Sequence, residues 1–153
     1  MFTSILKTTI LASIVFSTSL SAVTFDVIGA CSSTPLYEGR FRTDIGENVG
    51  VLSMEFFEDQ SIPYSGSEAG FSSINHSPEG LLAIEVLSDT KMRAYGWCFS
   101  VNGVVPNTLA SETYLTKQND YISWFYAYST YDQGVWTDYC VPSHKIKAPQ
   151  FCK

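Results

Sequence analysis

Four cysteines most constrain what this chain can fold into. Cys31, Cys98, Cys140 and Cys152 all follow an N-terminal segment that has the features of an export signal. An even number of cysteines in an exported chain of this size is typical of disulfides rather than of free thiols. The 153 residues match the length of one ordinary domain. We therefore expect one domain that is held by two disulfides.

We interpret residues 1–21 as a signal peptide. Lys7 precedes an apolar run over residues 8–16, and small residues follow it. This order is typical of a secretory signal that is cleaved near Ser21 or Ala22. The run is shorter than the roughly 18 apolar residues that a membrane anchor needs. The sequence thus predicts a secreted or periplasmic protein with no membrane span.

A lipidation signal is the alternative interpretation of this region. The stretch Ile28-Gly29-Ala30-Cys31 resembles a lipobox, in which the cysteine would become a lipidated N-terminus. Asp26 separates this stretch from the apolar run, however, and lipidation of Cys31 would leave three cysteines, which is an odd number. Cleavage by the secretory route is therefore favoured.

Charge and composition exclude several classes of partner. The chain is 45% hydrophobic and carries a formal net charge of −6, which becomes −7 once Lys7 leaves with the signal peptide. This acidic balance gives no electrostatic footprint for nucleic acid or for anionic lipid. The histidines, His76 and His144, are isolated, and no two cysteines have zinc-ligand spacing. We therefore expect no nucleic-acid partner, no metal and no cofactor.

Hydrophobic periodicity predicts strands at both ends of the chain and one helix between them. Alternation predicts strands over residues 23–30, 36–42, 81–87, 95–101 and 120–128, with a tight turn at Asn102-Gly103. Apolar residues at helical spacing from Ile45 to Phe56 predict the helix, with an N-terminal capping box at Asp44 and Glu47 and an end before Pro63. Residues 64–67 and 77–80 have the composition of loops. This order predicts an α+β fold with one helix on one face of a mixed sheet.

Two stretches resemble the signatures of the transcobalamin-like C-terminal domain family. The first is Gly96-Trp97-Cys98-Phe99-Ser100-Val101-Asn102-Gly103, and the second is Asp120-Tyr121-Ile122-Ser123-Trp124-Phe125-Tyr126. Asn119 stands where the second signature commonly has glycine. The resemblance implies a β-grasp fold over residues 22–130, with 131–153 as a cysteine-stapled extension of the same domain. It also raises the hypothesis of a cobalamin-like ligand, although the chain has no room for the helical domain that the vitamin carriers contain.

The resemblance also suggests how the cysteines pair. In a β-grasp sheet the first and last strands run parallel, so Cys31 and the chain after Tyr128 would emerge at the same end. This favours Cys31 with Cys140 and Cys98 with Cys152. Four cysteines allow three pairings, and the residues alone do not select one of them.

No group of residues predicts catalysis. Ser143 and His144 are adjacent only in sequence, whereas a catalytic triad is defined by its geometry. Glu55, Glu58 and Asp59 are most simply a solvated surface at the end of the helix. We therefore expect a non-enzymatic binding module that contacts a protein or a component of the cell envelope. A carrier of a small hydrophobic or corrinoid ligand is the alternative, and a hydrolase is the least favoured function.

The C-terminal tail is the predicted binding surface. The strand pattern stops after Tyr128, and Gly134, Pro142 and Pro149 predict irregular structure there. Rings on a loop that disulfides hold make good anchors for a partner, because they lose little conformational entropy on contact. Alternatively, the same rings cover the open face of the sheet and are buried. The candidate anchors are Tyr131, Trp136, Tyr139 and Phe151.

The cysteine count yields the first prediction. Mass spectrometry of the protein isolated without reductant should detect two disulfides, and reduction should lower the free energy of unfolding by a few kcal/mol for each bridge. Four free thiols in that sample would contradict the prediction.

Overall fold

In the computed structural model, residues 22–42, 46–117 and 119–153 form a six-stranded mixed sheet, one α-helix and a two-stranded hairpin. The predicted signal peptide lies outside these residues. No helix within them has the length and apolar character needed to cross a membrane. The elements in chain order are β1 (Ala22–Ile28), β2 (Pro35–Arg42), α1 (Val49–Asp59), β3 (Tyr64–Ser67), β4 (Gly70–Ile74), η1 (Gly80–Ala83), β5 (Ile84–Ser88), β6 (Lys91–Val101), η2 (Ala110–Glu112), β7 (Tyr121–Asp132), β8 (Val135–Pro142) and η3 (Ser143–Lys145).

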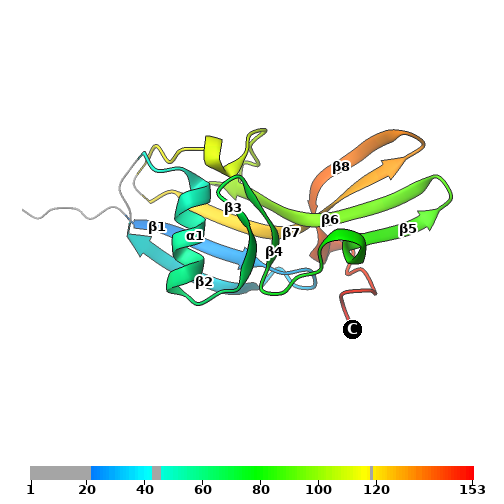
Figure 1. Ribbon diagram of the computed structural model, residues 1–153, viewed down its shortest axis with the longest axis horizontal. Coiled ribbons are helices and arrows are strands. Elements are labelled where there is room, and N and C mark those ends of the chain that lie inside the picture. The colour runs from blue at the N-terminus through cyan, green and yellow to red at the C-terminus, as the bar shows by residue number, and fades with distance from the viewer. Residues whose placement is uncertain (1–21, 43–45, 118) are drawn as a thin grey trace, which may run out of the picture.

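The large sheet is built around β6 and β7. Its strand order is β2-β1-β7-β6-β5, and β8 pairs with the second half of β7, beyond the end of β1 (Figure 1). β1 and β7 run parallel, and the other neighbours are antiparallel. The α+β class, with one helix on one face of a mixed sheet, is as the sequence predicts.

The main core lies between the sheet and the layer that α1 forms with the β3–β4 hairpin. Phe25 of β1 stacks on Phe56 of α1, with ring centroids 4.6 Å apart. The Trp124 indole is buried and donates a hydrogen bond of 2.8 Å to the Ser53 hydroxyl of α1. The alternating residues of the predicted strands therefore face the helix, and Trp124 of the second signature stretch lies in the core.

Asn48 caps the N-terminus of α1. Its side chain accepts a hydrogen bond of 2.9 Å from the Val51 amide, and Glu47 accepts one from the Asn48 amide. The predicted cap at Asp44 lies outside the described residues, and the helix begins at Val49 instead. The helix ends at Asp59, before Pro63, as predicted.

A second aromatic cluster lies farther along the same face of the sheet. The segment that follows β8 covers it, because Phe151 packs edge-on against Tyr95 and Tyr126. Ser143 is fully buried, and its hydroxyl lies 2.9 Å from the carbonyl oxygen of Tyr126 and 3.2 Å from that of Ala30. These contacts fix the end of the chain against both β1 and β7.

Three sequence predictions were wrong about local structure. The tail is not irregular, because β7 extends to Asp132 and β8 pairs with it. Gln133 and Gly134 both have positive φ, so the glycine makes a tight hairpin turn rather than ending the sheet. Residues 64–67 form β3 rather than a loop, and residues 80–83 form a 3₁₀ turn before the shorter strand β5.

Both predicted disulfides are present, but their pairing differs from the expected one. Cys31 bonds to Cys152, and Cys98 bonds to Cys140. The β7–β8 hairpin folds the chain back, so Cys140 returns to the level of Cys98. The last segment then passes Ala30 and brings Cys152 to Cys31. The expected pairing was wrong because β8 could not be read from the sequence.

Gly50 of α1 provides a test of this packing. A Cβ atom at this position would lie 1.8 Å from the carbonyl oxygen of Glu68, which belongs to the β3–β4 turn. Gly50→Ala should lower the free energy of unfolding by about 1–3 kcal/mol, the usual range for overpacking, as measured by chemical denaturation. Gly70→Ala is the control, because nothing lies within 4 Å of its added Cβ. Equal stability of the two variants would contradict the close approach.

Candidate functional site

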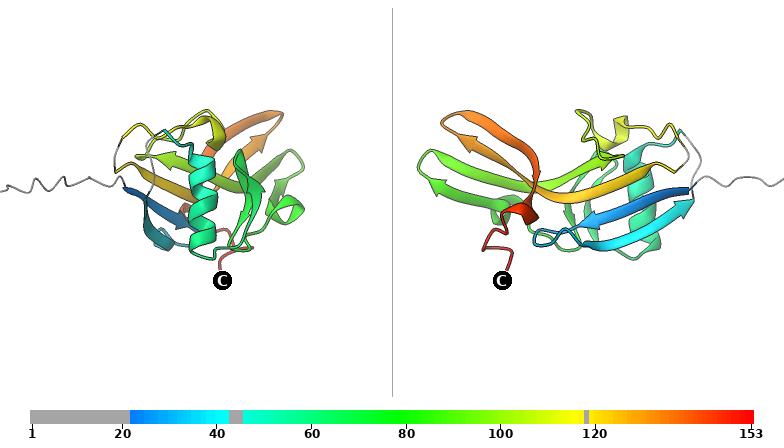
Figure 2. Two further views of the ribbon diagram at one scale, coloured as in Figure 1. Left: turned by 60° about the vertical axis from the view of Figure 1, so that its left-hand side comes forward. Right: turned by 180° about the vertical axis from the view of Figure 1, so that it is seen from behind.

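The two hairpins β5–β6 and β7–β8 extend the sheet away from α1. In Figure 1 they project to the right of the helix, and the view from behind in Figure 2 shows them diverging as two arms. Because β6 pairs with β7 to the ends of both strands, the arms belong to one continuous sheet. The sheet curls along this part, and its concave face is the one that faces away from α1.

Small side chains form the floor of the concave face. Along β6, large aromatics such as Tyr95 and Trp97 face the cores, and the residues between them face the other way. The paired residues of β7 follow the same rule, since Ala127 lies opposite Gly96 and Ser129 lies opposite Ala94. Ala94, Gly96 and Cys98 of β6, with Ala127 and Ser129 of β7, therefore give the groove a floor of small side chains.

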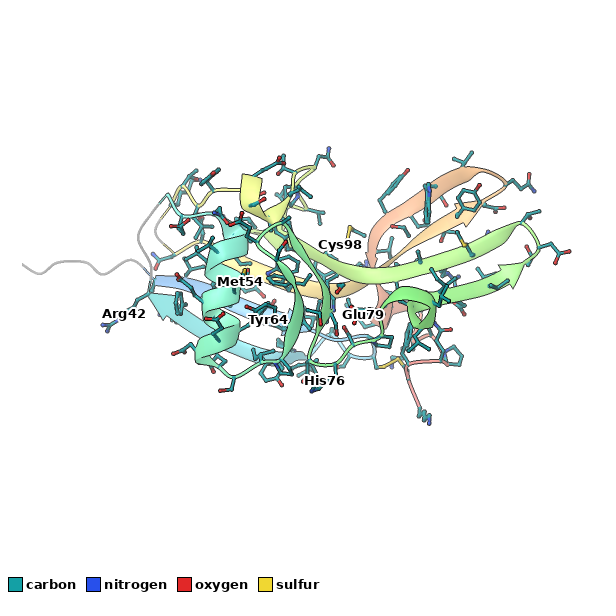
Figure 3. All side chains as sticks on the ribbon, viewed as in Figure 1. Arg42, Met54, Tyr64, His76, Glu79 and Cys98 are labelled. Carbon is teal, nitrogen blue, oxygen red and sulfur yellow. A yellow bond between two sulfur atoms is a disulfide. The ribbon has the colours of Figure 1, made fainter. Side chains whose placement is uncertain are left out.

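The disulfide between Cys98 and Cys140 explains why the sheet curls. β6 and β8 lie on opposite sides of β7, so in a flat sheet their backbones would be about 9.5 Å apart, which is two strand spacings. The Cα atoms of the two cysteines are only 5.9 Å apart. Figure 3 shows this bond between β6 and β8. The disulfide thus passes over β7 and holds β8 folded toward β6.

The backbone of β8 is shaped to reach this disulfide. Its pairing with β7 shifts register between Tyr128 and Thr130. Asp138 and Cys140 both have φ of 51°, in the left-handed region that side-chain-bearing residues seldom adopt. The Cys140 amide donates a hydrogen bond of 3.5 Å to the Ser129 hydroxyl. This irregular stretch turns the end of β8 over the floor.

Two aromatic side chains of β8 form one wall of the resulting groove. Trp136 is 39% exposed and Tyr139 is 71% exposed. The Tyr131 ring supports Trp136, with ring centroids 5.2 Å apart. The groove has a volume of about 380 Å³, and no charged residue is among the described residues that line it: Ala94, Tyr95, Gly96, Trp97, Cys98, Ala127, Tyr128, Ser129, Trp136 and Tyr139.

The structure brings together three of the four predicted anchors. Trp136 and Tyr139 line the groove, and Tyr131 packs behind Trp136. Phe151 lies on the opposite face of the sheet, where it lines a separate hollow of about 300 Å³ that also borders Trp97. The floor residues were not predicted from the sequence. The alternation of small and large residues along β6 and β7 could have revealed them.

The groove offers hydrogen-bond donors but no cluster for metal or acid–base chemistry. Within the described residues, the Trp136 indole N–H donates no hydrogen bond and the Tyr139 hydroxyl forms none. Residues 22–42, 46–117 and 119–153 contain no group of three or more His, Cys, Asp or Glu side chains placed to hold a metal ion. The arrangement suits contact with an uncharged surface.

The concave face becomes polar toward β1 and β2. Asp26 is 3% exposed and accepts a hydrogen bond from the Tyr121 hydroxyl. Burial, together with this bond to Asp26, raises the pKa of Tyr121 to about 12. Glu38 of β2 lies opposite Asp26 in the sheet register. Charged side chains on this face therefore lie toward β1 and β2 and not in the lining of the groove.

The carboxylates of α1 and the Ser143-His144 pair lie outside the groove. Glu55, Glu58 and Asp59 are exposed, as expected for a solvated surface, and Glu55 and Glu58 border a depression beside α1 with Glu68. Ser143 is buried against backbone carbonyls. His144 is half-buried, because η3 packs against β7.

Comparison with known proteins shows a distant structural similarity. No protein-family model and no curated protein matches the chain. Among solved structures, the chain is similar to the crystal structure of a protein described as a "putative metal binding protein" from Ruminococcus gnavus ATCC 29149. The two share 17% identity with a TM-score of 0.41, and the similarity covers 69% of this chain and 95% of the other. A likeness at this level carries no argument about function.

Exposure of Trp136 yields a stability prediction. Trp136→Ala should lower the free energy of unfolding by less than about 1.5 kcal/mol, because the ring is supported mainly by Tyr131 and the groove is open. Trp124→Ala should lower it by about 3–5 kcal/mol, as core truncations do. Thermal or urea denaturation measures both changes. A loss for Trp136→Ala as large as that for Trp124→Ala would show that Trp136 is a structural residue.

Proposed function

We propose that this protein is an exported, disulfide-stabilised binding module without catalytic activity, and that it binds an apolar segment of a partner protein in the groove between the arms. The observation that carries the proposal is the pair of exposed rings, Trp136 and Tyr139, on a wall that the Cys98–Cys140 disulfide anchors. The two disulfides also support export to the periplasm or the exterior, where such bonds persist.

The chemistry of the groove favours an uncharged, partly aromatic segment. Tryptophan and tyrosine dominate the energetics of protein interfaces, since each buries a large area with few rotatable bonds. Because a disulfide anchors the wall that carries these rings, less conformational entropy is lost on binding. The floor of glycine, alanine and serine leaves space for side chains that enter from the partner, and the indole and phenol groups can donate hydrogen bonds to its backbone.

We further propose that the part of the chain built from β1, β2, α1, β6 and β7 is a β-grasp domain of the transcobalamin-like type. The strand order β2-β1-β7-β6, with its central parallel pair and the helix on one face, supports this assignment. The two signature stretches occupy β6 and β7, which form the floor of the groove.

A carrier of a small hydrophobic ligand is the second candidate function. The volume of about 380 Å³ favours it, because binding sites for small molecules run from about 300 to 1,000 Å³. This value lies near the lower end of that range. A compact apolar ligand therefore suits the groove better than a corrinoid, which would extend beyond it.

Selection from a displayed library of random heptapeptides, with the mature, oxidised protein as bait, tests the proposal. Apolar peptides with aromatic residues should be enriched. Their affinity should fall at least about tenfold with Trp136→Ala and with Tyr139→Ala, which corresponds to the 1.4 kcal/mol or more that an interface anchor contributes. Tyr114→Ala is the matched control, because Tyr114 is 57% exposed and lies outside the groove.

Three outcomes separate the candidates. Failure to enrich any peptide, or equal binding by all three variants, would contradict the binding of a partner protein in the groove. Binding of N-phenyl-1-naphthylamine, a neutral apolar fluorophore, that is lost in Trp136→Ala without any peptide binding would favour the small-ligand carrier. Turnover of an ester, peptide or glycoside by the pure protein, abolished by one substitution, would contradict the non-enzymatic role.

A further inference from the structure

The outer edge of β5 is an unpaired strand edge with an apolar surface. β5 pairs with β6 on one side, and no described residue pairs with its other side. Val86 of this strand is 76% exposed. Leu81 and Leu82, in the 3₁₀ turn that leads into β5, are 92% and 78% exposed. Adjacent leucines with this exposure beside an open strand edge mark a surface for a partner.

The other edge strands of the sheet, β2 and β8, are protected against pairing with a strand of another molecule. β2 presents Glu38, Arg40 and Arg42 to solvent, and charges of this kind discourage the approach of another strand. β8 is made irregular by the left-handed residues Asp138 and Cys140. β5 carries one charge, Glu85, which Arg93 pairs on the same chain, and the register shift of β5 lies between Val86 and Ser88. The contrast singles out β5 as the edge that is open to pairing.

The charge distribution favours a second copy of this chain as the partner. Glu85 is the single charged residue in the segment 80–88. Its carboxylate forms an ion pair of 3.2 Å with Arg93 and accepts a hydrogen bond from the Tyr95 hydroxyl on the same chain. Two copies of this segment can therefore meet without the repulsion that the net charge of the protein would cause elsewhere.

We propose that two copies of this chain associate by antiparallel pairing of their β5 edges about a twofold axis near Val86. The backbone groups at a strand edge require another extended strand as partner. An antiparallel pair of identical strands is self-complementary and closes as a dimer. With the axis at Val86, this residue faces its own copy and Ile84 faces Ser88, so apolar residues meet at the centre. The proposal is independent of the ligand in the groove.

Sedimentation velocity of the mature, oxidised protein over micromolar to high-micromolar concentrations tests the proposal. The native protein should form dimers. Val86→Lys and Leu82→Asp should each raise the dissociation constant at least about tenfold, because each places a charge at the pairing surface. Both side chains are largely exposed, so circular dichroism should stay unchanged, as should the melting temperature measured at a concentration at which the native protein is also monomeric. Amide hydrogen exchange of residues 84–88 should slow as the concentration of the native protein rises.

Val104→Lys is the matched control. Val104 is 68% exposed but follows the tight turn at the other end of β6, so this variant should dimerise like the native protein. Trp136→Ala should also dimerise, which separates this test from the test of the groove. A native protein that stays monomeric at every concentration would overturn the proposal. Dimers that survive both Val86→Lys and Leu82→Asp, or that are lost in Val104→Lys, would place the interface elsewhere and overturn it as well.

Discussion

The antiparallel pairing of β6 with β7 supports every other part of this structure. The ladder runs from Lys91 opposite Asp132 to Val101 opposite Ile122. One half of it joins β1 and packs on α1, where Trp124 and Phe99 contribute to the main core. The other half projects beyond the helix and carries β5 and β8. Because both halves share two continuous strands, the arms are extensions of one sheet.

Long strands of this kind need support where they leave the core, and the two disulfides give it. The bond between Cys31 and Cys152 fixes the last segment against the end of β1, so that Phe151 covers Tyr95 and Tyr126. The bond between Cys98 and Cys140 acts on the opposite face and curls the sheet. Each bridge closes a long loop, which is the case in which a cross-link most restricts the unfolded chain.

The curl separates two kinds of surface on one face of the sheet. Toward β2 the face is polar and includes Asp26 and Tyr121. Over the arms it has a small-residue floor and an aromatic wall with no charged lining among the described residues. This lining is uncharged although the chain carries a formal charge of −6. A charged side chain in the groove would weaken apolar contacts with the aromatic wall. The uncharged lining therefore supports the groove as the binding site.

Local sequence determined much of this protein. Alternating apolar residues determined the strands around Phe25 and Trp124, and apolar residues at helical spacing determined the helix. Asn102-Gly103 formed a tight turn with positive φ at both residues. These signals can be read from the sequence because they act between neighbours in the chain. The count of four cysteines determined two disulfides. Only the tertiary structure decided which cysteines pair and which rings remain exposed. Trp136 and Phe151 are both aromatic residues of the C-terminal tail, and the sequence does not distinguish them. Trp136 belongs to β8 and lies on the concave face, whereas Phe151 is held on the opposite face beside the Cys31–Cys152 bond. That outcome depends on which strand of the sheet each segment meets, and contacts between residues far apart in the chain leave no local pattern to read.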